Sequence, residues 1–341
     1  MATMKIRVGV LGAGTVGGAL VQRLLHDRDL IREKAGVDLE LKLVAVKHLD
    51  KPRSFDLPAD RITDQAMSVV SSPGIDVVVE AIGGLDPTGD LLLTALRSAK
   101  PVVTANKELI ATRGEELFEA ANRSGVPLMY EAAVGGGIPV IRPLAESLAG
   151  ERIDRVSGIV NGTTNYILTA MTQDGRSFDE ALEEAKVLGY AEPDPSDDVS
   201  GRDAAFKTAI LARLAFGEWV APWQVECQGI EELSRADVEA AAAAGQVIKL
   251  IGVAERVGDT VSTRVAPVAL DAEHPLAGID GVTNAIYVEG PAIGRLLFTG
   301  PGAGGQPTAS ALLGDLIQVA SRRNWQGKAP SYRRPRQVLH R

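Results

Sequence analysis

A glycine-rich turn near the start of the chain restricts the fold more than any other feature of the sequence. It follows a short apolar run at residues 6–11 and opens a stretch with helical spacing of apolar residues at 16–25. Its residues are Gly12, Ala13, Gly14, Thr15, Val16 and Gly17. A G-x-G-x-x-G pattern between a strand and a helix is typical of dinucleotide-binding units. We expect Gly12 to make the turn, Gly14 to admit a pyrophosphate, and Gly17 to let the helix pack on the strand. The alternative is an ordinary tight β-α turn.

The first part of the chain alternates strand-like and helix-like segments. Apolar runs typical of buried strands fall at residues 6–11, 39–46, 76–80, 102–103 and 126–130, and helical spacing falls at 16–25, 91–99 and 115–123. Short apolar strands that alternate with helices indicate parallel β-α-β units. We therefore predict an α/β protein with an N-terminal, Rossmann-type parallel sheet and a dinucleotide-binding domain at residues 1–138.

The pattern changes after about residue 138. A capping box at Ser177 and Glu180 opens one helix, and a long helix is expected at residues 203–216. The Pro- and Asp-rich segment 190–202 is expected to be irregular, and strand-like runs follow at 247–254, 261–269 and 284–290. These segments predict a second, α+β domain at residues 139–305. A final helix at 306–330 is expected to return to the first domain.

The composition excludes several classes of function. The formal net charge is −8, which argues against a nucleic acid or an anionic membrane as the main partner. A single cysteine, Cys227, excludes disulfide frameworks, Cys-rich zinc sites and iron–sulfur clusters, and the four histidines are scattered. No apolar run approaches ~20 residues, and the N-terminus leaves no room for a signal peptide. We expect a cytoplasmic protein.

Basic residues follow the second expected strand. NAD binders usually place an acidic residue there for the ribose 2′-hydroxyl. This chain instead has Lys47 and His48, with Lys51 and Arg53 just beyond. A cationic cluster suits a 2′-phosphate, so we favour NADP(H), with NAD as the alternative. Asp50 weakens this inference, and a solvated basic turn is the competing interpretation.

An acidic loop precedes the expected helix at residues 203–216. Within seven residues it holds Glu192, Asp194, Asp197 and Asp198, stiffened by two prolines. Asp203 and Lys207 follow four residues apart and share a helix face. Alone, such a pair is usually a weak surface ion pair. Together with the loop, it could bind an amino-acid ammonium and place a lysine that protonates an alkoxide.

Six motifs resemble, in order, those of homoserine dehydrogenases. They are residues 80–84 (EAIGG), 103–107 (VTANK), 131–139 (EAAVGGGIP), 161–166 (NGTTNY), 189–198 (GYAEPDPSDD) and 201–207 (GRDAAFK). The resemblance covers about residues 5–320. It implies an NAD(P)-dependent interconversion of L-homoserine and L-aspartate 4-semialdehyde, a step in threonine, methionine and isoleucine biosynthesis.

The resemblance also implies roles for individual residues. Lys207 would be the proton donor and acceptor, Asp203 its partner, and Lys107 a second acid–base or orienting group. The substrate-binding residues would be Glu192, Asp198, Gly189 and Tyr190. Beyond the glycine turn and Lys47, the cofactor would meet Thr104, Lys107, Gly304 and Gly305.

A monovalent cation is a further implication of the same family. Glu131 and the backbone carbonyls of Val134, Gly136 and Ile138 resemble its cation site, and this hard-oxygen set suits Na⁺. The alternative is a glycine-rich hinge between domains. The resemblance further implies a homodimer formed through the second domain, and the short family form without a C-terminal regulatory domain.

Four other classes of protein are alternatives to this family. A dehydrogenase that forms an acyl phosphate needs a cysteine nucleophile, and Cys227 lies outside every motif. A zinc alcohol dehydrogenase lacks its ligands here. Another NADP-dependent amino-acid-semialdehyde reductase, or a non-catalytic NADP-binding sensor, remains an alternative, and a sensor would have no need of Lys207.

Overall fold

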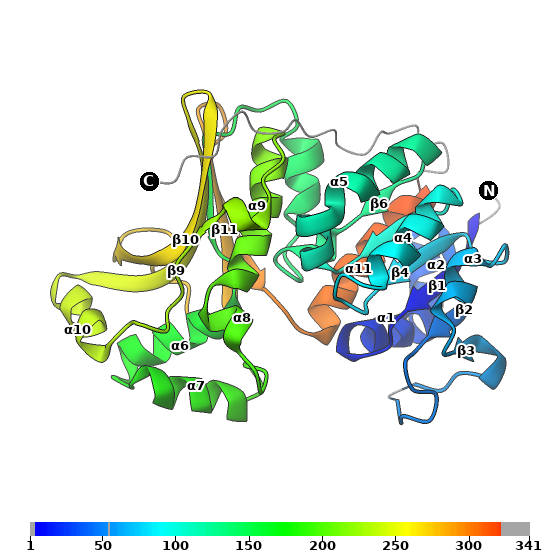
Figure 1. The fold of residues 1–341 in the computed structure, drawn as a ribbon, viewed down its shortest axis with the longest axis horizontal. Helices are drawn as coiled ribbons and strands as arrows, with labels where there is room; N and C mark the ends of the chain where they lie inside the picture. The colour runs from blue at the N-terminus through cyan, green and yellow to red at the C-terminus, as the bar shows by residue number, and fades with distance from the viewer. Residues whose placement is uncertain (1–3, 54, 322–341) are drawn as a thin grey trace. The chain divides into compact units, whose positions relative to one another are not determined.

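The computed structural model describes residues 4–53 and 55–321, and the chain divides into two units (Figure 1). Unit 1 consists of the residues up to Gly137 together with the described residues from Ala303 onward. Unit 2 is Ile138–Gly302.

Unit 1 is built on a parallel sheet of six strands. The strands are β1 (Met4–Leu11), β2 (Val37–Ala45), β3 (Ile62–Thr63), β4 (Val77–Glu80), β5 (Val102–Thr104) and β6 (Leu128–Met129). Their order is β3-β2-β1-β4-β5-β6, and every neighbouring pair is parallel. This is the order of dinucleotide-binding sheets, in which the ligand crevice lies at the carboxyl ends of the strands where the order reverses. The predicted Rossmann-type sheet is confirmed.

Six α-helices accompany this sheet in the described part of unit 1. They are α1 (Thr15–His26), α2 (Arg28–Ala35), α3 (Ala66–Ser71), α4 (Thr88–Arg97), α5 (Lys107–Ser124) and α11 (Gly305–Ser321). Figure 1 shows α11, in orange to red, beside α1, and the two helices are in contact. Leu20 of α1, Val8 of β1 and Leu312 of α11 share one apolar core. The return of the C-terminal helix thus completes the core of unit 1.

Several boundaries in unit 1 differ from expectation. The helix expected at 115–123 begins at Lys107, because the Asn106 side chain caps it by accepting from the Leu109 N–H at 2.9 Å. The strand expected at 126–130 shortens to Leu128–Met129, and the helix expected at 91–99 ends at Arg97. Residues 322–330 of the expected C-terminal helix lie outside the described residues.

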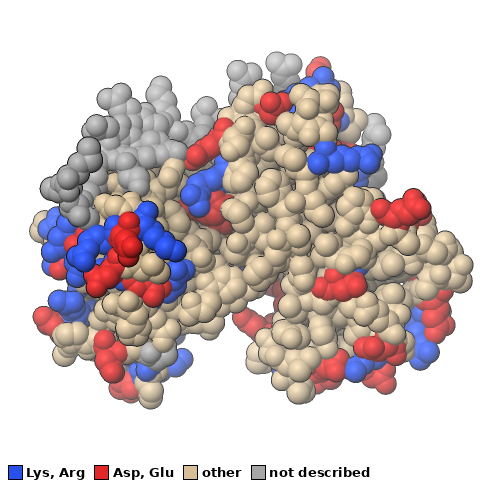
Figure 2. Space-filling view, turned by 180° about the vertical axis from the view of Figure 1, so that it is seen from behind, with Lys and Arg blue, Asp and Glu red and all other residues tan. Residues whose placement is uncertain are grey.

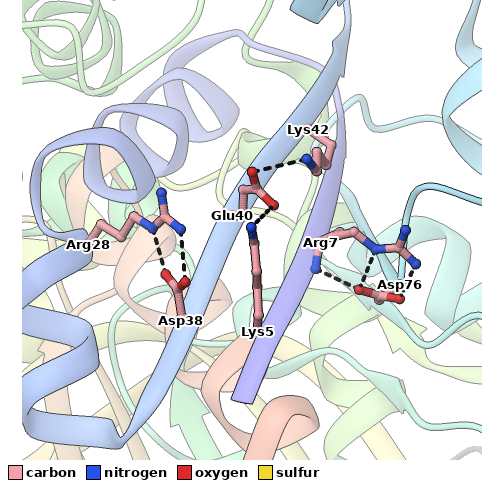
Figure 3. A network of polar contacts seen from close by, with 7 residues as sticks. All are labelled: Lys5, Arg7, Arg28, Asp38, Glu40, Lys42 and Asp76. Carbon is pink, nitrogen blue, oxygen red and sulfur yellow. Dashed lines mark hydrogen bonds and ion pairs between the residues drawn. The ribbon is translucent and has the colours of Figure 1, made fainter. Parts of the chain in front are cut away.

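Charged side chains on β1 and β2 pair with one another and with their surroundings (Figure 3). Glu40 binds Lys5 at 2.9 Å and Lys42 at 3.0 Å. Arg28 binds Asp38 through two hydrogen bonds of 2.6 and 2.9 Å, which lower the pKa of the Asp38 carboxyl. A third pair in the same view joins Arg7 to Asp76 at 2.7 Å. Each of these partly exposed pairs contributes little stability. Together they neutralise the charged side chains of β1 and β2.

Unit 2 contains a mixed sheet of six strands in the order β12-β11-β7-β9-β10-β8. The strands are β7 (Arg155–Ile159), β8 (Glu226–Cys227), β9 (Gln246–Val257), β10 (Thr260–Asp271), β11 (Thr283–Gly290) and β12 (Gly294–Pro301). Neighbours are antiparallel except β10 and β8. The three expected strands appear as β9, β10 and β11, and the predicted second domain of mixed helix and strand is confirmed. Strands β7, β8 and β12 were not expected.

The helices of unit 2 include the one expected at Ser177. They are α6 (Gly162–Gln173), α7 (Phe178–Val187), α8 (Ser196–Val199), α9 (Arg202–Phe216) and α10 (Arg235–Ala243). The capping box is present: Ser177 Oγ accepts from the Glu180 N–H, and the Glu180 carboxylate accepts from the Ser177 N–H at 2.8 Å. The expectation of an irregular segment at 190–202 is wrong for α8, where two acidic residues in the first turn suit the helix dipole.

The distribution of surface charge and the apolar character of the helices limit the partners that can be considered. Figure 2 shows one face on which Lys and Arg side chains are interleaved with Asp and Glu side chains. Within the described residues, no helix combines the length and the apolar character needed to cross a membrane.

Candidate active site

Helix α9 is held tightly against the sheet of unit 2. A Cβ added at Gly252 of β9 would lie 2.2 Å from the Thr208 hydroxyl oxygen on α9, so only glycine permits this approach. All residues of α9 from 203 to 213 are buried. The helix begins after Gly201, whose φ of +80° suits glycine. Close packing on this scale fixes the position of every side chain that the helix carries.

Lys207 and Asp203 form a buried ion pair on this helix. Their residues are 8% and 6% exposed, and Lys207 Nζ donates to Asp203 Oδ2 at 2.6 Å. Lys207 Nζ also donates to the Val160 carbonyl at 2.7 Å, just beyond β7. An ammonium group has three N–H bonds, so one remains for another acceptor. The interpretation as a surface ion pair is therefore wrong, and the geometry suits proton transfer to a bound oxygen.

Asn161 connects this pair to the acidic loop. Its Nδ2 donates to Asp198 Oδ1 at 2.6 Å and to Asp203 Oδ2 at 2.9 Å. Its Oδ1 accepts from the Thr164 N–H at 2.8 Å and thereby caps α6. Burial raises the pKa of the Asp198 carboxyl, while the hydrogen bond from Asn161 opposes this rise. The sequence analysis placed Asn161 in a family motif but gave it no role, although an asparagine before Gly-Thr-Thr is a helix-cap signal.

Of the four acidic residues in the loop, only Asp198 lies close to the cluster formed by Lys207, Asp203 and Asn161. Asp194 accepts from the Ser196 N–H at 3.2 Å, and Asp197 faces Arg202 at 3.4 Å. Glu192 is exposed, and within the described part of the chain its carboxylate has no hydrogen-bond or ion-pair partner. Asp198 therefore joins Asp203 and Lys207, while Glu192 lies exposed on the loop.

Tyr190, in the motif at residues 189–198, contacts the start of α6 close to Asp198. The Tyr190 carbonyl, which follows Gly189, accepts from the Thr163 hydroxyl at 2.7 Å. The Tyr190 ring lies 5.0 Å from the ring of Tyr166. A hydrogen bond of 2.5 Å to Glu184 raises the pKa of Tyr166 to about 12, so this phenol stays neutral near pH 7. These contacts secure the start of the loop against α6.

The glycine turn of unit 1 has a geometry that fits a dinucleotide. Gly12 has a φ of +92°, and a Cβ there would lie 2.6 Å from the Ala81 carbonyl oxygen. A Cβ at Gly17 would lie 2.1 Å from the Gly12 carbonyl oxygen, so Gly17 lets α1 pack on the turn. A Cβ at Gly14 would meet nothing within 4 Å. No neighbouring residue in the described chain therefore requires glycine at position 14. A phosphate that approaches the start of α1 would require it.

The other expected cofactor residues lie at the same edge of the sheet. Thr104 ends β5, Lys107 begins α5, and Lys47 lies exposed beyond the end of β2. Gly304 has a φ of +119°, and a Cβ at Gly305 would lie 2.9 Å from the Thr15 carbonyl oxygen. The start of α11 therefore lies against the glycine turn. In these parallel strands, this carboxyl edge is where ligands bind.

The basic residues after β2 have different roles. The Arg53 guanidinium donates to the carbonyl oxygens of Leu49 at 3.1 Å and Lys51 at 2.7 Å, and also to that of His48. Arg53 therefore shapes the loop. Lys47, His48 and Lys51 remain exposed, and their side chains are the ones available to a 2′-phosphate.

Glu80 is a buried acid at this edge that sequence reasoning left without a role. It is 0% exposed, and its Oε1 accepts from the N–H groups of Ile82 at 2.7 Å and Gly83 at 2.8 Å. Its Oε2 accepts from the Thr104 hydroxyl. Burial raises the pKa of the Glu80 carboxyl. Glu80 thus connects the loop after β4 to the end of β5. The sequence signal for such a role is a charged residue at the end of an otherwise apolar strand.

The expected cation ligands lie at the end of the unit 1 segment. Glu131 is 1% exposed, and its N–H donates to Asp315 Oδ2 at 2.8 Å. Val134 is buried, Gly136 has a φ of +53°, and Ile138 is the first residue of unit 2. No group of three or more His, Cys, Asp or Glu residues within residues 4–53 and 55–321 is arranged to hold a metal. The expected set, one carboxylate with backbone carbonyls, is of a different kind.

Comparison with known proteins gives a consistent result over most of the chain. The model for the homoserine dehydrogenase family matches residues 139–317, and that for the NAD-binding domain of homoserine dehydrogenase matches residues 12–131. A homoserine dehydrogenase from Synechocystis sp. is 46% identical over 320 residues, which is 93% of this chain and 73% of the relative. One from Bacillus subtilis is 45% identical over 92% of this chain and 72% of the relative.

Solved structures agree with these sequences. A homoserine dehydrogenase from Thiobacillus denitrificans has a TM-score of 0.89 and 43% identity, and covers 93% of this chain and 73% of that chain. A hyperthermophilic archaeal homoserine dehydrogenase in complex with NADPH has a TM-score of 0.76 and 28% identity, and covers 94% of this chain and 98% of that chain. The chain therefore belongs to the homoserine dehydrogenase family of NAD(P)-dependent oxidoreductases that act on a CH–OH group.

Proposed function

We propose that this chain interconverts L-homoserine and L-aspartate 4-semialdehyde with NADP(H), and that Lys207 exchanges the proton of the reacting oxygen. The observation that carries the proposal is the buried Lys207 ammonium, held by Asp203 and the Val160 carbonyl with one N–H left over. A cation fixed in this way stabilises the charge that develops on a carbonyl oxygen as it becomes an alkoxide.

The acid–base work falls to residues of unit 2. When bound, the nicotinamide supplies or accepts the hydride. In the reducing direction Lys207 gives a proton to the alkoxide, and in the oxidising direction it accepts the hydroxyl proton. Asp203 holds the Lys207 side chain in place through their 2.6 Å ion pair. Lys107, at the first turn of α5, is a second orienting or acid–base group for the same reaction.

Substrate selection rests on the acidic loop. Glu192 carries an exposed carboxylate, and Asp198 lies beside Asp203 and Lys207. Both suit the ammonium group of an amino acid, and Gly189 and Tyr190 shape the start of the loop. An alcohol without an ammonium group would forgo these charge-assisted contacts.

The cofactor binds along the carboxyl edge of the unit 1 sheet. Gly12 to Gly17 and the first turn of α1 receive the pyrophosphate, and Thr104, Gly304 and Gly305 border it. Exposed Lys47, with His48 and Lys51, favours a 2′-phosphate and therefore NADP(H) over NAD. The NADPH bound to the archaeal relative supports the same preference.

A sodium ion is the proposed partner of Glu131. Its buried carboxylate, with the carbonyls of Val134, Gly136 and Ile138, offers the hard oxygen donors that Na⁺ prefers. Replacing NaCl by choline chloride at constant ionic strength should lower the thermal midpoint, because a ligand that binds only the folded state stabilises it. Equal midpoints in the two salts would remove the ion from the account.

The cellular setting follows from the reaction and the composition. Homoserine chemistry places the enzyme in threonine, methionine and isoleucine biosynthesis. One exposed, free cysteine suits a reducing cytoplasm. The second domain is the proposed homodimer interface. Light scattering with size-exclusion chromatography gives the mass in solution, and a monomer at assay concentrations would contradict the dimer.

The reaction is tested by absorbance at 340 nm. L-homoserine should reduce NADP⁺ faster than NAD⁺ at equal concentrations. 4-Hydroxybutyrate, which lacks only the ammonium group, should be a far poorer substrate. No L-homoserine-dependent signal with either cofactor would overturn the proposed function, whereas a signal with NAD⁺ alone would overturn only the cofactor preference.

A further inference from the structure

The side chain of Asn161 lies between the two carboxylates nearest to Lys207. Asn161 is 5% exposed, and its amide nitrogen reaches Asp198 at 2.6 Å and Asp203 at 2.9 Å. Asp203 in turn holds Lys207 at 2.6 Å. One amide group therefore bridges the acidic loop and the helix that carries the lysine.

The orientation of this amide is fixed from its other side. The Thr164 N–H can only donate, and it lies 2.8 Å from the oxygen of the Asn161 side chain. The oxygen must therefore face α6, and the NH₂ group must face the carboxylates. Serine or aspartate would cap the helix about equally well, but neither supplies two N–H donors. The choice of asparagine is explained by the carboxylates and not by the cap.

Two adjacent carboxylates repel each other unless donors separate them. Asp198 faces Asp203 and Lys207 on α9, and Asn161 and Thr163 at the start of α6. Asp203 and burial both favour the protonated form of Asp198, whereas Asn161, Lys207 and Thr163 favour the ionised form. Without the Asn161 donors, Asp198 would take up a proton at a higher pH, and Asp203 would lose one of the contacts that hold it in place.

We propose that Asn161 is a positioning residue that holds Asp198 in place for the substrate ammonium and keeps Asp203 aligned with Lys207. This inference rests on the proposed function, because it assigns Asn161 to the same reaction. Asn161 acts through its two acidic neighbours and holds neither the proton nor the hydride.

The test compares pH profiles of kcat/KM for L-homoserine. In Asn161→Ser the helix cap is kept and both N–H donors are lost. The acid limb of the profile should move up by about one pH unit, and kcat should fall about 10- to 100-fold, because hydrogen bonds to charged groups are lost. In Asn161→Asp the cap is also kept and a third carboxylate is added, so the acid limb should move further in the same direction.

A matched control lies four residues further along the same helix. Asn165 is 1% exposed, and its amide donates to the carbonyls of Ile279 and Thr283, away from Lys207. Asn165→Ser should lower the thermal midpoint and leave the acid limb where it is in the wild type. If Asn161→Ser matched this control in its pH profile, the role of Asn161 would be purely structural and the proposal would be wrong. A wild-type enzyme inactive on homoserine would instead remove the proposed function.

Discussion

Two alanine substitutions in the glycine turn should separate cofactor binding from folding. In Gly14→Ala the new Cβ meets nothing within 4 Å of the protein, whereas in Gly17→Ala it lies 2.1 Å from the Gly12 carbonyl oxygen. The first change should therefore weaken the binding of the pyrophosphate, and the second should destabilise the folded chain. The two residues stand three positions apart at the start of one helix, so each variant controls for the other.

The stability effects follow from these distances. At Gly17 the new Cβ would clash with the carbonyl group of Gly12. Because that group belongs to the backbone, α1 must shift, and such overpacking costs about 3 kcal/mol. The better helix propensity of alanine offsets about 1 kcal/mol, which leaves a loss of about 2 kcal/mol. At Gly14 the φ of −75° suits alanine, and a weaker helix cap is offset by a less flexible unfolded chain, so the net change should stay below about 1 kcal/mol.

The assay pairs thermal unfolding with fluorescence titration of NADPH. Gly14→Ala should keep its midpoint within about 3 °C and weaken NADPH binding at least tenfold, which is about 1.4 kcal/mol. Gly17→Ala should lower the midpoint by about 5 °C or more. Wild-type affinity for NADPH in Gly14→Ala would show that the open space at Gly14 has no connection with the cofactor.

Two further predictions concern acids. Burial raises the pKa of Glu80, so the folded chain holds that proton more tightly than the unfolded chain does. The stability of the wild type relative to Glu80→Gln should therefore be greatest below about pH 4 and should decline as the pH rises, and a difference that is flat or grows with pH would contradict this account. Glu192→Gln should raise KM for L-homoserine about three- to tenfold with a smaller change in kcat, because an exposed charge contributes to substrate binding and not to the transition state alone. Glu183→Gln, which removes an exposed carboxylate from α7, is its control, and equal KM values in the two variants would count against a role for Glu192.

The fold could be predicted where local pattern and tertiary structure agree. Strands β4 and β5 of unit 1 are buried along their whole length, so they stand out as continuous runs, and the glycine turn marks where β1 ends. Strands β7 and β12 were missed because their residues alternate weakly and depend on pairing with β11. The start of α5 was not predicted because the helix is fixed there by the Asn106 cap and not by the spacing of apolar residues.

The site could be predicted by residue type but not by partner. Spacing placed Asp203 and Lys207 on one face, yet their burial depends on the contact between Thr208 and Gly252, which lie far apart in the sequence. The acidic loop suggested four equivalent carboxylates, and only the structure shows that Asp198 alone turns inward. Arg53 was grouped with the basic residues after β2, although its guanidinium binds the carbonyl oxygens of its own loop.

In the proposed reaction the Lys207 ammonium moves the proton of the reacting oxygen, and the turnover of Lys207 variants measures this role. Lys207→Arg keeps a cation beside Asp203 but does not release its proton near neutral pH, and Lys207→Met removes the charge. Both should bind NADPH with wild-type affinity, because the glycine turn is untouched. Homoserine oxidation at saturating substrate should fall about 10²- to 10⁴-fold in each. Wild-type turnover in either variant would contradict the account.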